Sequence, residues 1–173
     1  MTIAVRSTLD VAFWFVDRAD SLGAELSDRK LQALLYLAQL EYAAAHEGRK
    51  LMPATFLAAE SGPFEPTIYH IFQEGRPRLV TALPPPRVDA FLADMWRRFG
   101  ALGDEALGTM AREDSYYRRA FAVERLAEIV FPVAMPKTGA KSPPGGERSV
   151  RTTDGRVATK WTPGAYNKKL GNS

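Results

Sequence analysis

The chain has 173 residues, a length suited to one domain with a hydrophobic core, and a formal net charge of +3. It contains no cysteine, which excludes disulfides, thiolate nucleophiles and cysteine-ligated metal clusters. Residues 136–173 carry eight Lys or Arg and two acids, a net charge of +6. Residues 1–135 carry 15 bases and 18 acids, a net charge of −3, so the larger part of the chain is not a basic surface for nucleic acid.

The sequence contains no segment typical of a signal peptide or a membrane span. Near the start there is one short apolar run, Val11 to Val16, with Asp10 and Asp17 on either side. A secretory signal needs a longer apolar stretch and a small-residue cleavage site. No apolar stretch approaches the roughly 18 residues that span a bilayer. We therefore expect a cytoplasmic protein without membrane contact.

Apolar periodicity and cap signals predict six helices in the first 130 residues. In chain order they cover residues 9–22, 28–47, 66–72, 87–102, 104–112 and 115–130. Ser27 can cap the second helix, and Gly48 can end it in a left-handed conformation. Apolar residues cover more than half the circumference of this helix, so we expect it at the centre of the domain.

Residues 51–64 interrupt the helical pattern. Pro53 and the pair Gly62-Pro63 favour an extended segment or a small β element there, and Pro66 suits the first turn of the next helix. The predicted fold class is mainly α, a compact bundle of about five to six helices with a short extended segment or small β element near 51–64.

The composition changes near Pro136, which predicts a domain over 1–135 and a disordered basic tail over 136–173. Ten of the 38 tail residues are Gly or Pro, too many for a segment with few large aliphatic residues to bury a core. Two roles for the tail are open. It either anchors a partner, which is the protease-tethering role described below, or it only keeps the protein soluble. Its candidate anchors are aromatic, basic and aliphatic residues: Trp161, Tyr166, Lys168, Lys169 and Leu170.

No recognisable catalytic or metal-binding pattern is present. The two histidines, His46 and His70, have no second histidine at metal-ligand spacing. Residues 139–142, GAKS, lack the glycines that precede the lysine in a phosphate-binding loop. Acidic neighbours such as Glu113-Asp114 suit helix starts. We expect no enzyme, no catalytic residue, no metal and no cofactor.

Two local patterns stand out instead. Residues 29–38, RKLQALLYLA, place leucines toward the core, and Lys30 and Gln32 are expected to point away from them. Tyr36 can bring its hydroxyl to the flank of the helix. The second pattern is residues 60–64, ESGPF, followed by Pro66 and Tyr69, and it turns the chain before the helix that begins at Pro66. Both patterns also suit a purely structural role in turns and packing.

These patterns resemble the Panacea domain, a family that includes SocA-type antitoxins. The similarity covers about residues 5–130, and its closing acidic–aromatic–basic segment is similar to residues 113–120. Ala33 and Ser61 depart from the usual lysine and tyrosine of the family pattern. The matching positions are Lys30, Leu31, Gln32, Leu34, Leu35, Tyr36, Ala38, Gly48, Leu51, Met52, Gly62, Pro63, Pro66, Ile68, Tyr69 and Phe72.

The resemblance implies an antitoxin that neutralises a cognate protein toxin by direct contact. Its SocA branch further implies a proteolytic adaptor, which delivers the toxin to the ClpXP protease through ClpX. The residues expected to contact the toxin lie in the two patterns: Lys30, Gln32, Tyr36, Glu60, Pro63, Phe64 and Tyr69.

Two alternatives remain open at this point. The +6 tail could bind nucleic acid, as in a regulator of its own operon, and such binding would weaken steeply with salt. An enzyme of unrecognised type is the other alternative, since sites made only of carboxylates leave no clear sequence pattern.

Overall fold

The computed structural model describes residues 3–79, 81–131, 149–151 and 157–159. The chain divides into two units, Met1–Ala134 and Met135–Ser173. In the second unit, the strands β3 (Ser149–Arg151) and β4 (Val157–Thr159) pair antiparallel. The prediction of a disordered tail otherwise falls outside the described residues.

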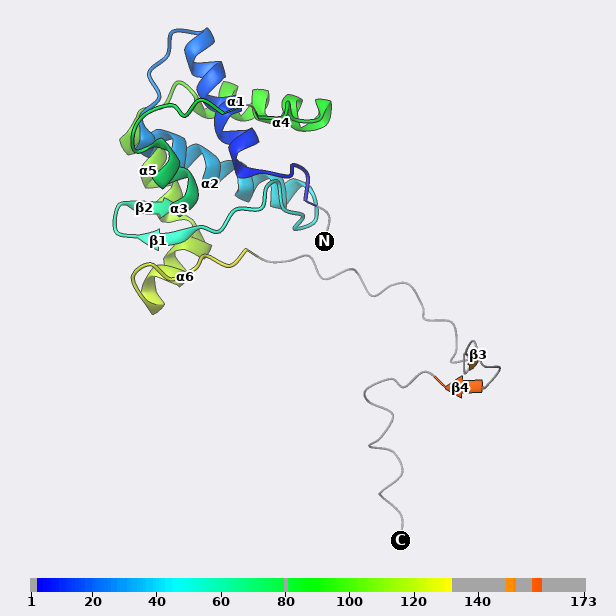
Figure 1. Ribbon diagram of the computed structural model, residues 1–173. Helices are drawn as coiled ribbons and strands as arrows, with labels where there is room; N and C mark the ends of the chain where they lie inside the picture. The colour runs from blue at the N-terminus through cyan, green and yellow to red at the C-terminus, as the bar shows by residue number, and fades with distance from the viewer. Residues whose placement is uncertain (1–2, 80, 132–148, 152–156, 160–173) are drawn as a thin grey trace. The chain divides into compact units, whose positions relative to one another are not determined.

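The first unit is mainly helical, as predicted, and Figure 1 shows its order of elements. Residues near 51–64 form a small β hairpin, which confirms the predicted β element. Among the described residues, no helix has both the length and the apolar character needed to cross a bilayer. The bounds are α1 (Thr8–Ser21), α2 (Asp28–Ala45), β1 (Leu57–Ala59), β2 (Gly62–Phe64), α3 (Pro66–Phe72), α4 (Pro86–Phe99), α5 (Asp104–Glu113) and α6 (Ser115–Val123).

Short polar residues and left-handed residues mark the ends of the first two helices. The Ser27 hydroxyl accepts a hydrogen bond from the Lys30 amide at 3.1 Å and so caps α2, as predicted. Gly23 follows α1 with a φ angle of 61°, whereas α2 ends at Ala45 and Glu47 is the first left-handed residue after it, with a φ angle of 54°, ahead of the predicted Gly48 at 77°. These angles are left-handed, and glycine adopts them without steric cost.

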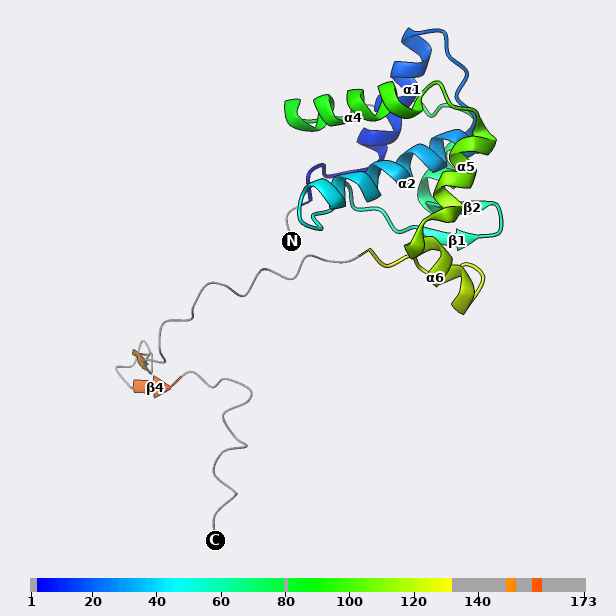
Figure 2. The same cartoon turned by 180° about the vertical axis from the view of Figure 1, so that it is seen from behind.

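The central position predicted for the second helix is confirmed. Helix α2 packs against α1, α3, α4 and α5 and against β2. Figure 1 and the reverse view in Figure 2 both show α2 between the α1–α4 pair and the β hairpin. Ten consecutive residues of α2, 30–39, are all buried, so this helix has no exposed face over that stretch.

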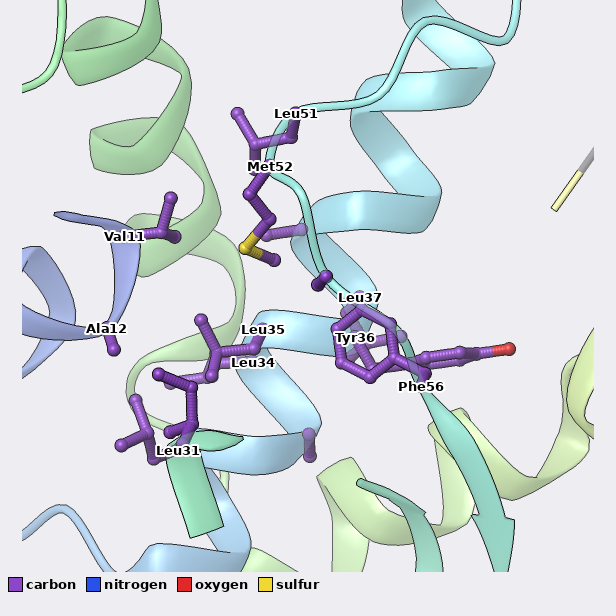
Figure 3. Packing of buried hydrophobic residues seen from close by; sticks show 14 of the residues in the cluster. Val11, Ala12, Leu31, Leu34, Leu35, Tyr36, Leu37, Leu51, Met52 and Phe56 are labelled. Atoms are coloured by element: carbon purple, nitrogen blue, oxygen red, sulfur yellow. The ribbon is translucent and has the colours of Figure 1, made fainter. Parts of the chain in front are cut away.

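The core gathers around the leucines and the tyrosine of α2. Figure 3 shows Leu31, Leu34 and Leu35 beside Val11 and Ala12 of α1. On the other side, the Tyr36 ring lies edge-on to the Phe56 ring, with 5.4 Å between the ring centroids. Aromatic contacts of this kind stabilise a core beyond the area that they bury.

The hairpin is extended by a third segment of chain. Leu57 pairs with Phe64 and Ala59 with Gly62, so Glu60 and Ser61 form a two-residue turn. The other edge of β1 bonds to residues 126–129: the Ala58 amide donates to the Ala127 carbonyl at 2.9 Å, and the Leu126 amide donates to the Ala58 carbonyl at 2.9 Å.

This pairing corrects one predicted boundary. The last helix was expected over 115–130, but α6 ends at Val123. Beyond it the backbone amide of Ile129 donates to the Phe56 carbonyl at 2.8 Å, and Ile129 is buried. Backbone bonds to β1 and burial of Ile129 thus outweigh the helical periodicity of residues 124–130.

Candidate functional site

An open groove of about 320 Å³ lies between β2, the first half of α2 and α5. Its lining is mainly apolar, with acidic residues where α2 and α5 begin. The lining residues are Asp28, Arg29, Gln32 and Ala33 of α2; Ala59, Ser61, Gly62, Pro63 and Phe64 of the hairpin; Tyr69 of α3; Asp104, Gly108 and Ala111 of α5; and Leu126.

A glutamine of α2 holds the hairpin against the helix. The backbone amide of Glu65 donates to Gln32 Oε1 at 2.7 Å, and Gln32 Nε2 donates to the Glu65 carbonyl at 3.4 Å. The Glu65 carboxylate in turn accepts from the Ile68 amide at 2.6 Å and caps α3. Gln32 and Glu65 are both buried, so this clamp fixes the position of β2 and the start of α3.

Three hydrogen bonds tie α2 to α5 and to the turn before it. The Ser27 hydroxyl donates to Asp104 Oδ2, and Lys30 Nζ donates to the Gly100 carbonyl at 2.8 Å. Tyr36 donates from its hydroxyl to Asp114 Oδ2 at 2.6 Å. Since these contacts hold both ends of α5, they set the width of the groove between α5 and β2.

The Tyr36 hydroxyl is kept in its protonated form. Burial and the hydrogen bond to the Asp114 carboxylate raise the pKa of Tyr36 well above its ordinary value of 10.0. Asp114 Oδ2 also accepts from the amides of Tyr116 and Tyr117 and so caps α6. Burial also raises the pKa of Tyr117, whose hydroxyl donates to the Ala59 carbonyl at 2.7 Å.

Large apolar side chains form the lip of the groove. Tyr69 is 49% exposed and lies edge-on to Phe64, with 5.9 Å between the ring centroids. Leu126 is 54% exposed and has a φ angle of 64°. A leucine in this left-handed region costs about 1–2 kcal/mol, and the backbone bonds to Ala58 hold it there.

The seven residues predicted to contact a toxin fall into two groups. Pro63, Phe64, Tyr69 and Gln32 line the groove, and Glu60 is exposed at the hairpin turn beside it. Lys30 and Tyr36 are buried, with their polar atoms bonded to Gly100 and Asp114.

The orientation predicted for Lys30 and Gln32 is therefore corrected. Both side chains were expected to point away from the core, but they are 8% and 7% exposed. The reason is that the Gly100 carbonyl, in the turn between α4 and α5, and the Glu65 backbone lie on the flank of α2 and supply hydrogen-bond partners there. The tail candidates Trp161, Tyr166, Lys168, Lys169 and Leu170 lie outside the described residues.

Several groove residues had no place in the predicted site. Asp104, Gly108 and Ala111 follow each other at spacings of four and three and so share one face of α5. That spacing is visible in the sequence, but the sequence does not show that the hairpin and α2 lie opposite this face of α5. Leu126 gave no signal, because only the pairing with β1 brings it to the groove.

The described residues hold no group of three or more His, Asp or Glu side chains placed to bind a metal ion. Comparison with protein-family models, curated proteins and solved structures gives no match to this chain.

Replacing Gln32 by Leu should lower the free energy of unfolding by about 1–3 kcal/mol. The leucine keeps the volume but leaves the buried Glu65 amide without its acceptor. Gln73→Leu is the matched control, because Gln73 is exposed, and its effect should stay within about 0.5 kcal/mol. Urea unfolding measures both, and equal effects would show that the clamp does not stabilise the domain.

The raised pKa of Tyr36 predicts a loss of stability at high pH. Tyrosine in the unfolded chain ionises near pH 10.0, whereas the native Tyr36 keeps its proton, so this contribution is present below pH 10 and is lost as the pH rises. The loss is about 1.4 kcal/mol per pH unit above that value.

The test is urea unfolding of the wild type and of Tyr36→Phe at about pH 9 and about pH 11. Tyr36→Phe should be less stable than the wild type at the lower pH, by about 1–2 kcal/mol, because one hydrogen bond is lost. The gap should close at the higher pH, since Phe does not ionise. A gap that stays constant would contradict the burial of a protonated Tyr36 in the native state.

Proposed function

We propose that this chain is an antitoxin that binds and neutralises a cognate protein toxin. One observation carries the proposal: the two sequence patterns similar to the Panacea domain, residues 29–38 and 60–69, meet at a single open groove. Residues 39–59 separate them in the chain, and the Gln32–Glu65 clamp joins them. This arrangement suits a surface that the fold builds for a partner.

The character of the lip also favours a protein partner. Tyr69, Phe64 and Leu126 keep apolar surface in contact with water around a hollow. Contiguous exposed apolar surface of this kind marks interaction sites, and buried aromatic anchors supply much of the binding energy in protein interfaces. The proposal therefore assigns the groove and its lip to toxin binding and gives the chain no catalytic role.

We further propose that the protein acts as an adaptor between its toxin and the ClpXP protease. In this scheme the helical domain holds the toxin, and residues 137–173 reach ClpX. A tethered cargo has an effective concentration at the protease on the order of millimolar, so neither contact has to be tight. The net charge of +6 on residues 136–173 against −3 on residues 1–135 supports this division of roles.

Co-expression tests the antitoxin function. The proposal predicts a small open reading frame adjacent to this gene whose product stops growth when induced alone, and growth should return when this chain is produced with it. The two products should also co-purify, because neutralisation is expected to occur by direct contact. A neighbouring product that is harmless, or one that remains toxic in the presence of this chain, would contradict the proposal.

Deletion of residues 137–173 tests the adaptor role. The shortened chain should bind the toxin with unchanged affinity but should no longer shorten the half-life of the toxin in a reaction with purified ClpXP and ATP. A chain in which Trp161, Tyr166 and Leu170 are replaced by Ser keeps the tail length and charge and serves as the matched variant. Degradation at the wild-type rate by the deleted chain would refute the adaptor role and leave the antitoxin function standing.

A further inference from the structure

We propose that the groove between β2, α2 and α5 receives one amphipathic helix of the partner, with apolar side chains inserted into the groove and a Lys or Arg facing Asp28 and Asp104. The proposal deepens the proposed function, on which it rests for the partner being a protein. Four observations lead to it: the small residues in the groove, the strained Leu126, the backbone of β2, and the acidic end.

Small residues open the groove along one face of α5 and α2. Gly108 and Ala111 of α5 and Ala33 of α2 carry little or no side chain where the groove is lined. A Cβ on Gly108 would meet only the end of a flexible side chain, Arg112 Nη1, at 3.1 Å. A glycine inside a helix costs about 1 kcal/mol relative to alanine, and here it leaves room for apolar side chains from outside.

Leu126 points to an apolar ligand. Its left-handed backbone is strained, yet its side chain is more than half exposed and lines the groove. Burial in this chain therefore does not explain a leucine at this position. Strained residues tend to gather where a ligand is bound, and a leucine at the lip gives an incoming side chain an apolar contact.

The backbone of β2 favours a helix over an added strand. The Ala58 backbone bonds to Leu126 and Ala127, on the side away from β2, so Ala58 and its partner Pro63 form a pair without mutual hydrogen bonds. The backbone nitrogen and carbonyl of Pro63 therefore point to the outer edge of β2. Because proline has no amide hydrogen, this nitrogen cannot donate a hydrogen bond. Since Gly62 and Phe64 point their amides toward β1, an incoming strand would find no donor along β2.

Charge at one end of the groove selects a basic residue in the partner. Asp28 and Asp104 are exposed, and the Ser27–Asp104 hydrogen bond brings the starts of α2 and α5 together there. Within the described part of the chain neither carboxylate forms an ion pair. Arg29 lies beside them and leaves the local balance at one net negative charge, which a Lys or Arg of the partner complements.

The experiment selects peptides that bind the full chain, so the toxin does not have to be identified first. A display library of peptides of about 16 residues, some four turns of helix, is enriched on the wild type, and individual peptides are then synthesised for fluorescence anisotropy. Enriched sequences should share apolar residues at spacings of three and four and at least one Lys or Arg.

Two substitutions of one residue test whether these peptides occupy the groove. Gly108→Leu fills it and should weaken binding by about tenfold or more. Gly108→Ala is the matched control, since it adds one carbon and improves helix propensity, and it should change affinity by about twofold at most. Both variants should unfold at a urea concentration no lower than the wild type, so a loss of affinity cannot come from misfolding.

The lip and the acidic end are tested separately. Leu126→Asn introduces a residue that tolerates the left-handed backbone, and it should weaken binding by about tenfold. The control is Leu83→Asn, at a leucine that is 93% exposed and lies away from the groove, and it should not weaken binding. Asp28→Asn should weaken binding by about two- to fivefold, and the difference should shrink at high salt.

The outcomes separate this proposal from the antitoxin function. If no peptide is enriched, or if the enriched peptides bind Gly108→Leu as tightly as the wild type, the groove proposal is overturned. Neutralisation of the toxin by Gly108→Leu as well as by the wild type would also overturn it and leave the antitoxin function intact. Peptides that bind the groove in a chain that neutralises no neighbouring product would support the groove proposal and contradict the antitoxin function.

Discussion

The fold depends on the need to satisfy polar groups that α2 carries into the interior. Helix α2 is buried on all sides over residues 30–39, and Lys30, Gln32 and Tyr36 lie in that stretch. A buried polar group without a partner costs about 1–3 kcal/mol, so each of these side chains requires a specific neighbour. Within the described residues every buried side-chain nitrogen and oxygen atom has a hydrogen-bond partner. The three partners are Gly100, Glu65 and Asp114, and they place three separate segments around one helix.

The groove follows from the positions of those segments. Gln32 fixes β2 on one side, and the bonds of Ser27, Lys30 and Tyr36 fix the two ends of α5 on the other. Between them, small residues leave the intervening space unfilled. The buried residues of the two patterns thus build the frame of the groove, while its exposed residues are free to contact a partner. That division accounts for the burial of Lys30 and Tyr36, which were expected on the binding surface.

Local signals in the sequence predicted the helices and a small β element near 51–64, because caps, prolines and glycines act within a few residues. Ser27 and Pro66 each set a helix start that the structure confirms, whereas α2 ends at Ala45, three residues before the predicted Gly48. The end of α6 could not be predicted this way, since bonds from β1, more than 60 residues earlier, extend the chain after Val123. For the same reason the sequence pointed to Tyr69 and Pro63 but not to Leu126 or Gly108, whose roles depend on contacts between distant segments.

Two residues that break local rules lie at the groove. Gly108 weakens the middle of α5, and Leu126 holds a backbone conformation that suits glycine or asparagine, as does Glu47 after α2, away from the groove. Helix propensity alone favours alanine at Gly108, and the left-handed backbone alone favours glycine or asparagine at Leu126. Departures from local consistency are expected at functional sites, where a binding partner offsets their cost. Two such departures around one hollow are therefore a stronger argument for a binding site than the size of the hollow itself.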